Sequence, residues 1–194
     1  MDKNNEKNEK NKSIRDICFI AIFTAIIAVF AQVSIPMPAG VPFTLQTFII
    51  PLAGIILGSK KGTLAVVIYV ILGAAGIPVF SQQTGGIACL FGRTGGFILS
   101  FPLMALCTGI FSDISSNKIL RVRYFLIAAG LVIGSAINYT CGMMMFSFVT
   151  SCGLKDAFVF CVLPFIPTAV LKIIIAGILG ENIRRILKKG RILT

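Results

Sequence analysis

Residues 18–33 read CFIAIFTAIIAVFAQV, a run without a charged side chain that ends at the turn residues SIPMPAG of 34–40. The run is too long for the apolar core of a typical signal peptide, and it carries no A-x-A cleavage site. It therefore predicts a helix that lies in lipid.

The rest of the chain is also strongly apolar. Of its 194 residues, 56% are hydrophobic and 13% are charged, whereas a soluble domain carries about 25% charged residues. The mean hydropathy is +0.94. This composition excludes disorder, and a soluble fold would have no interior large enough for so much apolar surface. The sequence predicts an all-α integral membrane protein, a bundle of six transmembrane helices.

Outward from 18–33, apolar runs and turn signals divide the chain into six predicted helices. They cover residues 18–33, 41–58, 63–75, 97–111, 124–150 and 157–187, the last with Pro164 and Pro167 near its start. A glycine-rich stretch, 76–96, separates the third helix from the fourth. Residues 1–16 are predicted to form a polar, solvated tail, 17–187 the transmembrane domain, and 188–194 a basic tail.

Pairs of small residues four positions apart predict where helices pack closely. Such pairs are Gly54 with Gly58, Gly130 with Gly134, and Ala176 with Gly180. They also arise by chance in glycine-rich membrane chains, so each pair is a candidate contact.

The basic residues are distributed unequally between the predicted connections. Of 18 Lys and Arg residues, five precede residue 17, two are Lys60 and Lys61, three lie in 113–123 and five follow residue 183. The remaining connections hold only Arg93 and Lys155, and Lys172 falls inside the last helix. The positive-inside rule then predicts that both termini are cytoplasmic, in a multi-pass protein of the cell membrane. Because the cations sit at the ends of apolar runs and form no basic face, a nucleic-acid partner is not expected.

The sequence lacks residue types and motifs that several classes of function require. The chain has no histidine, which removes His-ligated metal sites and His-dependent triads. It lacks G-x-x-x-x-G-K-[ST], H-E-x-x-H and G-x-S-x-G, and its six cysteines form no C-x-x-C. We expect no enzyme activity, no cofactor and no metal site, and energy for uphill transport would have to come from another chain.

Two cations are candidates for ligand binding. Lys172 lies about five residues beyond Pro167, roughly 8 Å along the helix. A lysine in mid-helix costs about 2.5–3.5 kcal/mol on insertion scales, so it either snorkels to the surface or has a partner or ligand. Arg93 lies in GRTGG, directly before the predicted helix 97–111, where a guanidinium and free backbone amides suit a carboxylate.

Other candidate residues are polar or aromatic and converge on the predicted outer side. They are Thr44 and Gln46 at the start of a helix, Asn138 and Tyr139 within a helix, Gln83 in the glycine-rich stretch, and Phe43 and Phe80 as apolar walls. Hydrogen bonds between helices would equally explain Asn138 and Tyr139, and Gln83 would equally suit a loop without a binding role. The expected ligand is small and partly apolar, with hydrogen-bonding groups and an anionic end.

A succession of short motifs resembles one known family. The motifs are VPFTLQTF (41–48), PLAG (51–54), LG (57–58), LAV (64–66) with Tyr69, LG (72–73), GIPVF (76–80) and GRTGG (92–96), then Asn138-Tyr139 and LPFIP (163–167) leading to Lys172. With these motifs, residues 17–187 resemble the BioY family, the biotin-specific S-components of energy-coupling-factor (ECF) transporters.

The resemblance implies a six-helix membrane protein that binds biotin from outside and works with a transmembrane coupling protein and two cytoplasmic ATPases. It implies that Ala21 and Ala25 match an A-x-x-x-A face that binds the coupling protein. Two positions depart from the family pattern. Arg93 stands where many members have Pro, and Ala169 stands where members commonly have Asp, three residues before the helix lysine. The ureido N–H groups of biotin would lose a carboxylate acceptor, which Gln46, Asn138 or a backbone carbonyl would have to replace.

Two other function classes stay open at this point. A small intramembrane enzyme is disfavoured because no acid–base pair lies within the predicted spans. A structural subunit without a ligand leaves Lys172 and the stretch 76–96 without a role. Biotin that co-isolates with the purified protein would separate the S-component from both alternatives.

Overall fold

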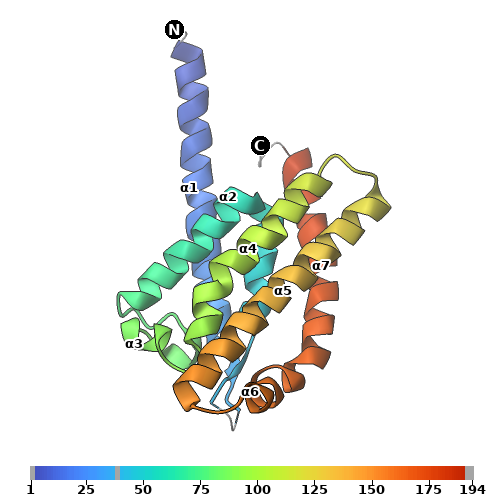
Figure 1. The fold of residues 1–194 in the computed structure, drawn as a ribbon. Helices are drawn as coiled ribbons and strands as arrows, with labels where there is room; N and C mark the ends of the chain where they lie inside the picture. The colour runs from blue at the N-terminus through green and yellow to red at the C-terminus, as the bar shows by residue number, and fades with distance from the viewer. Residues whose placement is uncertain (1–2, 38–39, 191–194) are drawn as a thin grey trace.

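The computed structural model describes residues 3–37 and 40–190, and these form a bundle of long helices (Figure 1). The elements in chain order are α1 (Lys3–Gln32), β1 (Ser34–Ile35), β2 (Phe43–Thr44), α2 (Gln46–Ala74), η1 (Ser81–Gln83), α3 (Ile87–Leu90), α4 (Gly95–Ser115), α5 (Leu120–Thr150), α6 (Leu154–Cys161), η2 (Leu163–Phe165) and α7 (Ile166–Lys189). The expected all-helical membrane fold is confirmed. Of the two predicted tails, residues 1–2 and 191–194 lie outside the described residues, and the polar N-terminal segment is helical from Lys3.

Helix α2 consists of two helical segments that meet at Gly58. The backbone there has φ 82° and ψ 176°, a conformation that is essentially restricted to glycine. The Asp113 carboxylate of α4 accepts hydrogen bonds from the Ser59 backbone N–H at 2.9 Å and the Ser59 hydroxyl at 2.7 Å. It thus provides an acceptor for a backbone N–H at the start of the second segment, which has no partner within the helix. The two segments correspond to the second and third predicted helices. Within the described residues, α1, the two segments of α2, α4, α5 and the stretch from α6 to α7 match the six predicted helices.

Two predicted helix boundaries are wrong. The predicted helix 41–58 begins at Gln46, because residues 43–44 pair with 34–35 as a short antiparallel ladder. The predicted helix 157–187 is divided into α6, η2 and α7. Pro164 and Pro167 lie at the starts of η2 and α7, where a missing N–H costs least.

The small-residue pairs contribute to helix packing. A Cβ added at Gly54 would collide with the Ala105 carbonyl of α4, and one at Gly130 of α5 would lie 2.7 Å from Cβ of Phe111. A Cβ at Gly180 of α7 would lie 2.8 Å from Ile55. The expected close contacts are therefore confirmed at these three glycines, whereas Gly58 is the residue at which α2 changes direction.

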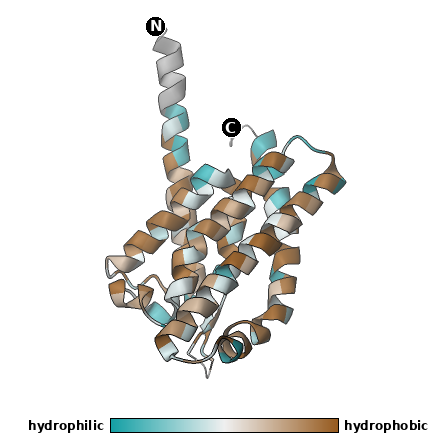
Figure 2. Ribbon diagram, viewed as in Figure 1, coloured by the Kyte–Doolittle hydropathy of each residue, from teal (hydrophilic) through white to brown (hydrophobic). Residues whose placement is uncertain are grey.

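The long helices of the bundle are apolar over most of their length, as their brown colour in Figure 2 shows. Among residues 3–37 and 40–190, five helical stretches are long and apolar enough to cross a membrane: 11–32, 46–74, 95–115, 120–150 and 154–189, the last of which includes both α6 and α7. Aromatic side chains such as Phe148 and Phe125 are 83% and 73% exposed, which suits lipid and not water. Both termini lie at one end of the bundle, and α3 and α6 lie at the other (Figure 1).

Candidate functional site: a cavity opposite the termini

A cavity lies where the starts of α2 and α4 meet α5 and the α6–α7 corner. Its lining includes Val41, Pro42, Thr44, Gln46, Thr47, Ser81, Thr94, Phe97, Ile98, Phe101, Tyr139, Cys161, Phe165 and Lys172. These residues come from six separate parts of the chain, so only the folded bundle assembles the site. The cavity is at the end of the bundle that carries α3 and α6, away from the termini.

Lys172 of α7 points inward and crosses to the start of α2. Its Nζ donates to the Thr44 carbonyl oxygen at 2.7 Å and to the Thr47 hydroxyl at 3.0 Å, and it lies 4.1 Å from the centroid of the Phe43 ring. These partners rule out the snorkelling alternative. The ammonium group is held at the cavity wall by hydrogen bonds and a cation–π contact.

Gln46 forms a second polar part of the wall. Its Nε2 donates to the Tyr69 hydroxyl at 2.6 Å, and its Oε1 accepts from the Thr44 hydroxyl at 3.1 Å. Tyr69 in turn donates to the Val79 carbonyl at 3.1 Å. The chain of hydrogen bonds fixes the amide of Gln46 and ties the first turn of α2 to the glycine-rich stretch after it.

Aromatic rings form the apolar walls. Phe97 and Tyr139 of the lining meet edge to face at 6.3 Å, and Phe165 of the lining stacks on Phe43 behind it with centroids 6.1 Å apart. The free volume is about 40 Å³, against about 10–15 Å³ for one water on the same measure. A bicyclic ligand therefore requires these side chains to move outward.

Asn138 lies behind the cavity wall and is only 1% exposed. Its Nδ2 donates to the Phe97 carbonyl at 3.0 Å and to the Ser100 hydroxyl at 2.8 Å, so it joins α5 to α4. Its Oδ1 has no hydrogen-bond partner among the described residues. Asn138 thus forms the predicted hydrogen bonds between helices in this structure. Its Oδ1 remains as a buried acceptor next to the wall residue Tyr139.

Five predicted site residues are not part of the cavity lining. Phe43 contacts the lining residues Lys172 and Phe165, and Asn138 lies behind the wall. The other three lie between residues 80 and 93 of the chain. Phe80 is fully buried and packs edge to face on Tyr69 at 5.6 Å. Gln83 is exposed, and its backbone N–H donates to the Gln32 side chain at 3.0 Å. Arg93 lines a different hollow with Phe146 and Phe160, and its Nη1 lies 3.0 Å from the point where a Cβ of Gly40 would be.

The sequence reasoning missed several wall residues. Thr47 lies in the first turn of α2 next to Gln46 and three residues after Thr44, so the cluster of polar residues at 44–47 was a usable signal. Phe97 and Phe101 occupy the first turns of α4 directly after the glycine-rich stretch, but apolar residues in a membrane helix give no sign of which face meets a ligand. Within residues 3–37 and 40–190 no cluster of three His, Cys, Asp or Glu side chains could hold a metal ion.

Comparison with known proteins places the chain in one family. A family model described as the BioY family matches residues 3–189. The chain is 38% identical over 170 residues to a "Probable biotin transporter BioY" of Pyrococcus horikoshii, which covers 88% of this chain and 96% of the relative. It is 35% identical over 173 residues to a "Biotin transporter BioY" of Thermotoga maritima, with 89% and 98% covered.

A solved structure shows the same fold. The crystal structure of "the S-component for biotin from an ECF-type ABC transporter" matches with a TM-score of 0.78 and 26% identity, over 90% of this chain and 93% of that chain. The resemblance inferred from the motifs between residues 41 and 172 is confirmed. This multi-pass membrane protein belongs to the BioY family.

Proposed function

We propose that this protein is the biotin-binding S-component of an ECF-type transporter, and that it captures biotin at the end of the bundle opposite its termini. Family membership carries this proposal, because relatives named as biotin transporters match this chain over nearly their whole length. The cavity supports it, since its apolar walls and its one cation match a partly apolar ligand with an anionic end.

The chemistry of the wall suggests how biotin is oriented. The carboxylate of biotin suits the Lys172 ammonium group, and its thioether-containing ring suits the aromatic walls at Phe97 and Phe165. Ala169 offers no carboxylate to the ureido N–H groups. The oxygens available nearby are the Gln46 amide, the Thr44 carbonyl and the unpartnered Oδ1 of Asn138.

We also propose that α1 docks on a transmembrane coupling protein that works with two cytoplasmic ATPases. Ala21 and Ala25 are both exposed on the outer face of α1, so their small side chains do not serve packing within this bundle. Two small residues four positions apart let a second helix approach closely in lipid. The chain also carries no nucleotide-binding motif.

Co-isolation of ligand with the purified protein tests the proposed substrate. We expect one biotin per chain after purification in detergent without added biotin, identified by mass spectrometry of the released ligand. Biotin methyl ester, which has no carboxylate, should bind more weakly in titration of ligand-free protein. Protein that neither retains nor binds biotin would overturn the proposal.

A further inference from the structure

The segment 80–84 covers one side of the cavity and is built on strained backbone. Gln82 and Gln83 are both in the left-handed region, with φ 59° and 56°. Residues other than glycine adopt this conformation at a cost in free energy and keep it only when the surroundings hold them there. Ser81 of this segment lines the cavity.

One side chain from another element holds this segment at two points. Gln32, in the last turn of α1, donates from Nε2 to the Phe80 carbonyl at 3.2 Å. Its Oε1 accepts from the backbone N–H of Gln83 at 3.0 Å. The carboxamide thus bonds to the segment on both sides of the strained residue Gln82.

The same segment is connected with the polar wall of the cavity. The ring of Phe80 packs on Tyr69, whose hydroxyl accepts from Gln46 at 2.6 Å and donates to Val79 at 3.1 Å. A shift of segment 80–84 therefore reaches both Ser81 and Gln46 in the wall. Gln32 itself does not line the cavity, so any effect it has on the ligand acts through these residues.

Gln32 also lies in line with the small residues of α1. Ala21, Ala25, Ala28 and Gln32 follow at intervals of four, three and four residues, which places them in one stripe along the helix. A second helix packed along this stripe would extend toward Gln32. Other ties of α1 lie elsewhere on its surface: Thr24 donates to the Ala65 carbonyl at 3.0 Å, and Asp16 pairs with Lys61 at 2.6 Å.

We propose that Gln32 is a positioning residue that holds segment 80–84 against the ligand cavity and connects that segment to the helix proposed to dock on the coupling protein. The inference rests on the proposed function for the identity of the ligand. Its structural part, that Gln32 restrains the segment, can be tested without any ligand.

Hydrogen–deuterium exchange of the full-length purified protein tests the restraint. In Gln32→Ala we expect the backbone amides of 82–84 to exchange roughly tenfold faster, because both bonds to the segment are lost. Gln32→Glu keeps an acceptor for the Gln83 N–H but cannot donate to Phe80, so it should retain protection at Gln83. Ile22→Ala, at an exposed position of α1 outside the stripe, should leave exchange at 83–84 unchanged. Equal exchange in Gln32→Ala and the parent would overturn the proposal even if biotin binds normally.

The ligand part is tested by release of radiolabelled biotin into excess unlabelled biotin. Gln32→Ala should release biotin roughly tenfold faster at an unchanged unfolding temperature, Gln32→Glu should be intermediate, and Ile22→Ala should match the parent. Faster exchange with an unchanged release rate would disprove the connection between the segment and the cavity. If the parent protein binds no biotin, the proposed function fails, while the exchange experiment still decides whether Gln32 restrains the segment.

Discussion

Lys172 lies within an apolar helix, and its ammonium group reaches the residues at the start of α2. The Thr44 carbonyl and the Thr47 hydroxyl each accept a hydrogen bond from its Nζ, and the Phe43 ring lies against the ammonium group. These contacts offset a cost of about 2.5–3.5 kcal/mol for a lysine in mid-helix on insertion scales. They also leave the cation at the cavity wall, where a ligand carboxylate can replace one of the protein acceptors.

The variant Lys172→Met removes this charge and keeps most of the side-chain length. We expect the dissociation constant for biotin to rise roughly 10- to 150-fold, because a charge-assisted hydrogen bond contributes about 1.5–3 kcal/mol. Isothermal titration of the purified variant measures the change.

Two further variants make that result specific. Lys155→Met changes an exposed lysine of α6 at the same end of the molecule and should keep the parent affinity. Arg93→Ala tests the other predicted cation. Affinity lost only in Arg93→Ala would assign the carboxylate to the second hollow, and affinities within twofold of the parent in both Lys172→Met and Arg93→Ala would contradict the whole assignment.

Gly58 allows α2 to reverse direction, and its replacement tests this role. Gly58→Ala should lower the free energy of unfolding by about 1–3 kcal/mol, since the new Cβ would lie 2.8 Å from Asp113 Oδ1 on a backbone with φ 82°. Thermal unfolding in detergent measures the loss. Gly177→Ala is the matched control, because a Cβ there meets its nearest neighbour at an ordinary 3.5 Å. An equally stable Gly58→Ala protein would show that the reversal does not need glycine.

At the scale of the element, α1 presents two different faces. Phe23, Ile27 and Ala31 are buried against the bundle, whereas Ala21 and Ala25 are exposed. A helix that only completed a bundle would gain nothing from small residues on its lipid-facing side. The outer stripe is therefore available to a partner, while the inner face and Gln32 keep α1 attached to α2 and to segment 80–84.

Bulky residues on the outer stripe should separate ligand binding from transport. In Ala21→Trp/Ala25→Trp we expect biotin binding by the purified protein to be unchanged and energised uptake into cells to be lost, because the added rings keep the partner helix away. Ile22→Trp places the same ring at a neighbouring exposed position outside the stripe and should still transport. Normal uptake by the double variant, together with normal co-purification of the ATPases, would rule out this surface as the docking site.

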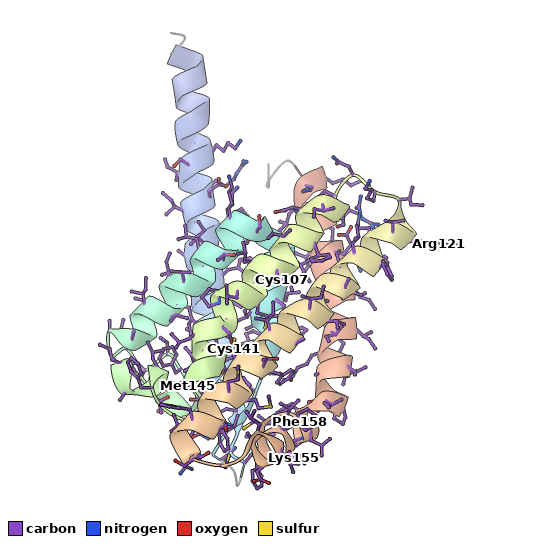
Figure 3. The ribbon with its side chains drawn as sticks, in the orientation of Figure 1. Cys107, Arg121, Cys141, Met145, Lys155 and Phe158 are labelled. Atoms are coloured by element: carbon purple, nitrogen blue, oxygen red, sulfur yellow. The ribbon has the colours of Figure 1, made fainter. Side chains whose placement is uncertain are left out.

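At the scale of the whole molecule, charge is concentrated at the end that carries both termini. Figure 3 shows Arg121 at this end and Lys155 at the opposite end. Ion pairs tie the helix ends together here: Arg184 of α7 bonds to Asp113 of α4 at 2.5 Å, and Arg123 of α5 bonds to the buried Glu181 of α7 at 2.7 Å. Both termini lie at this end of the bundle (Figure 1), and the positive-inside rule predicts that this end faces the cytoplasm.

Labelling of single cysteines tests the predicted orientation in intact cells. In a background without the native cysteines, a membrane-impermeant maleimide should react at Gln82→Cys and Lys155→Cys and not at Lys60→Cys and Lys188→Cys. Permeabilised cells provide the control, since all four positions should then react. The reverse pattern in intact cells would place the cavity on the cytoplasmic side.

The difference between local and long-range information explains which of the predicted site residues the structure brings together. Thr44, Gln46, Tyr139 and Lys172 were predicted as site residues, and all four line one cavity. Each is a polar group within or at the end of an apolar run, so the cost of burying it is evident from its neighbours in sequence. Arg93, Gln83 and Phe80 lie in a connection without such periodicity, and contacts with Gly40, Gln32 and Tyr69 decide where they point.

The sequence by itself determined that the chain spans a membrane as a six-helix bundle, and its motifs indicated the family, because hydropathy, charge placement and short motifs are properties of consecutive residues. Only the tertiary structure decided that α2 begins after a strand pair, that Lys172 turns inward to Thr44 and Thr47, and that Gln32 reaches segment 80–84. Those contacts join residues up to 128 positions apart. Their partners are chosen by the packing of the whole bundle, and no local pattern in the chain encodes them.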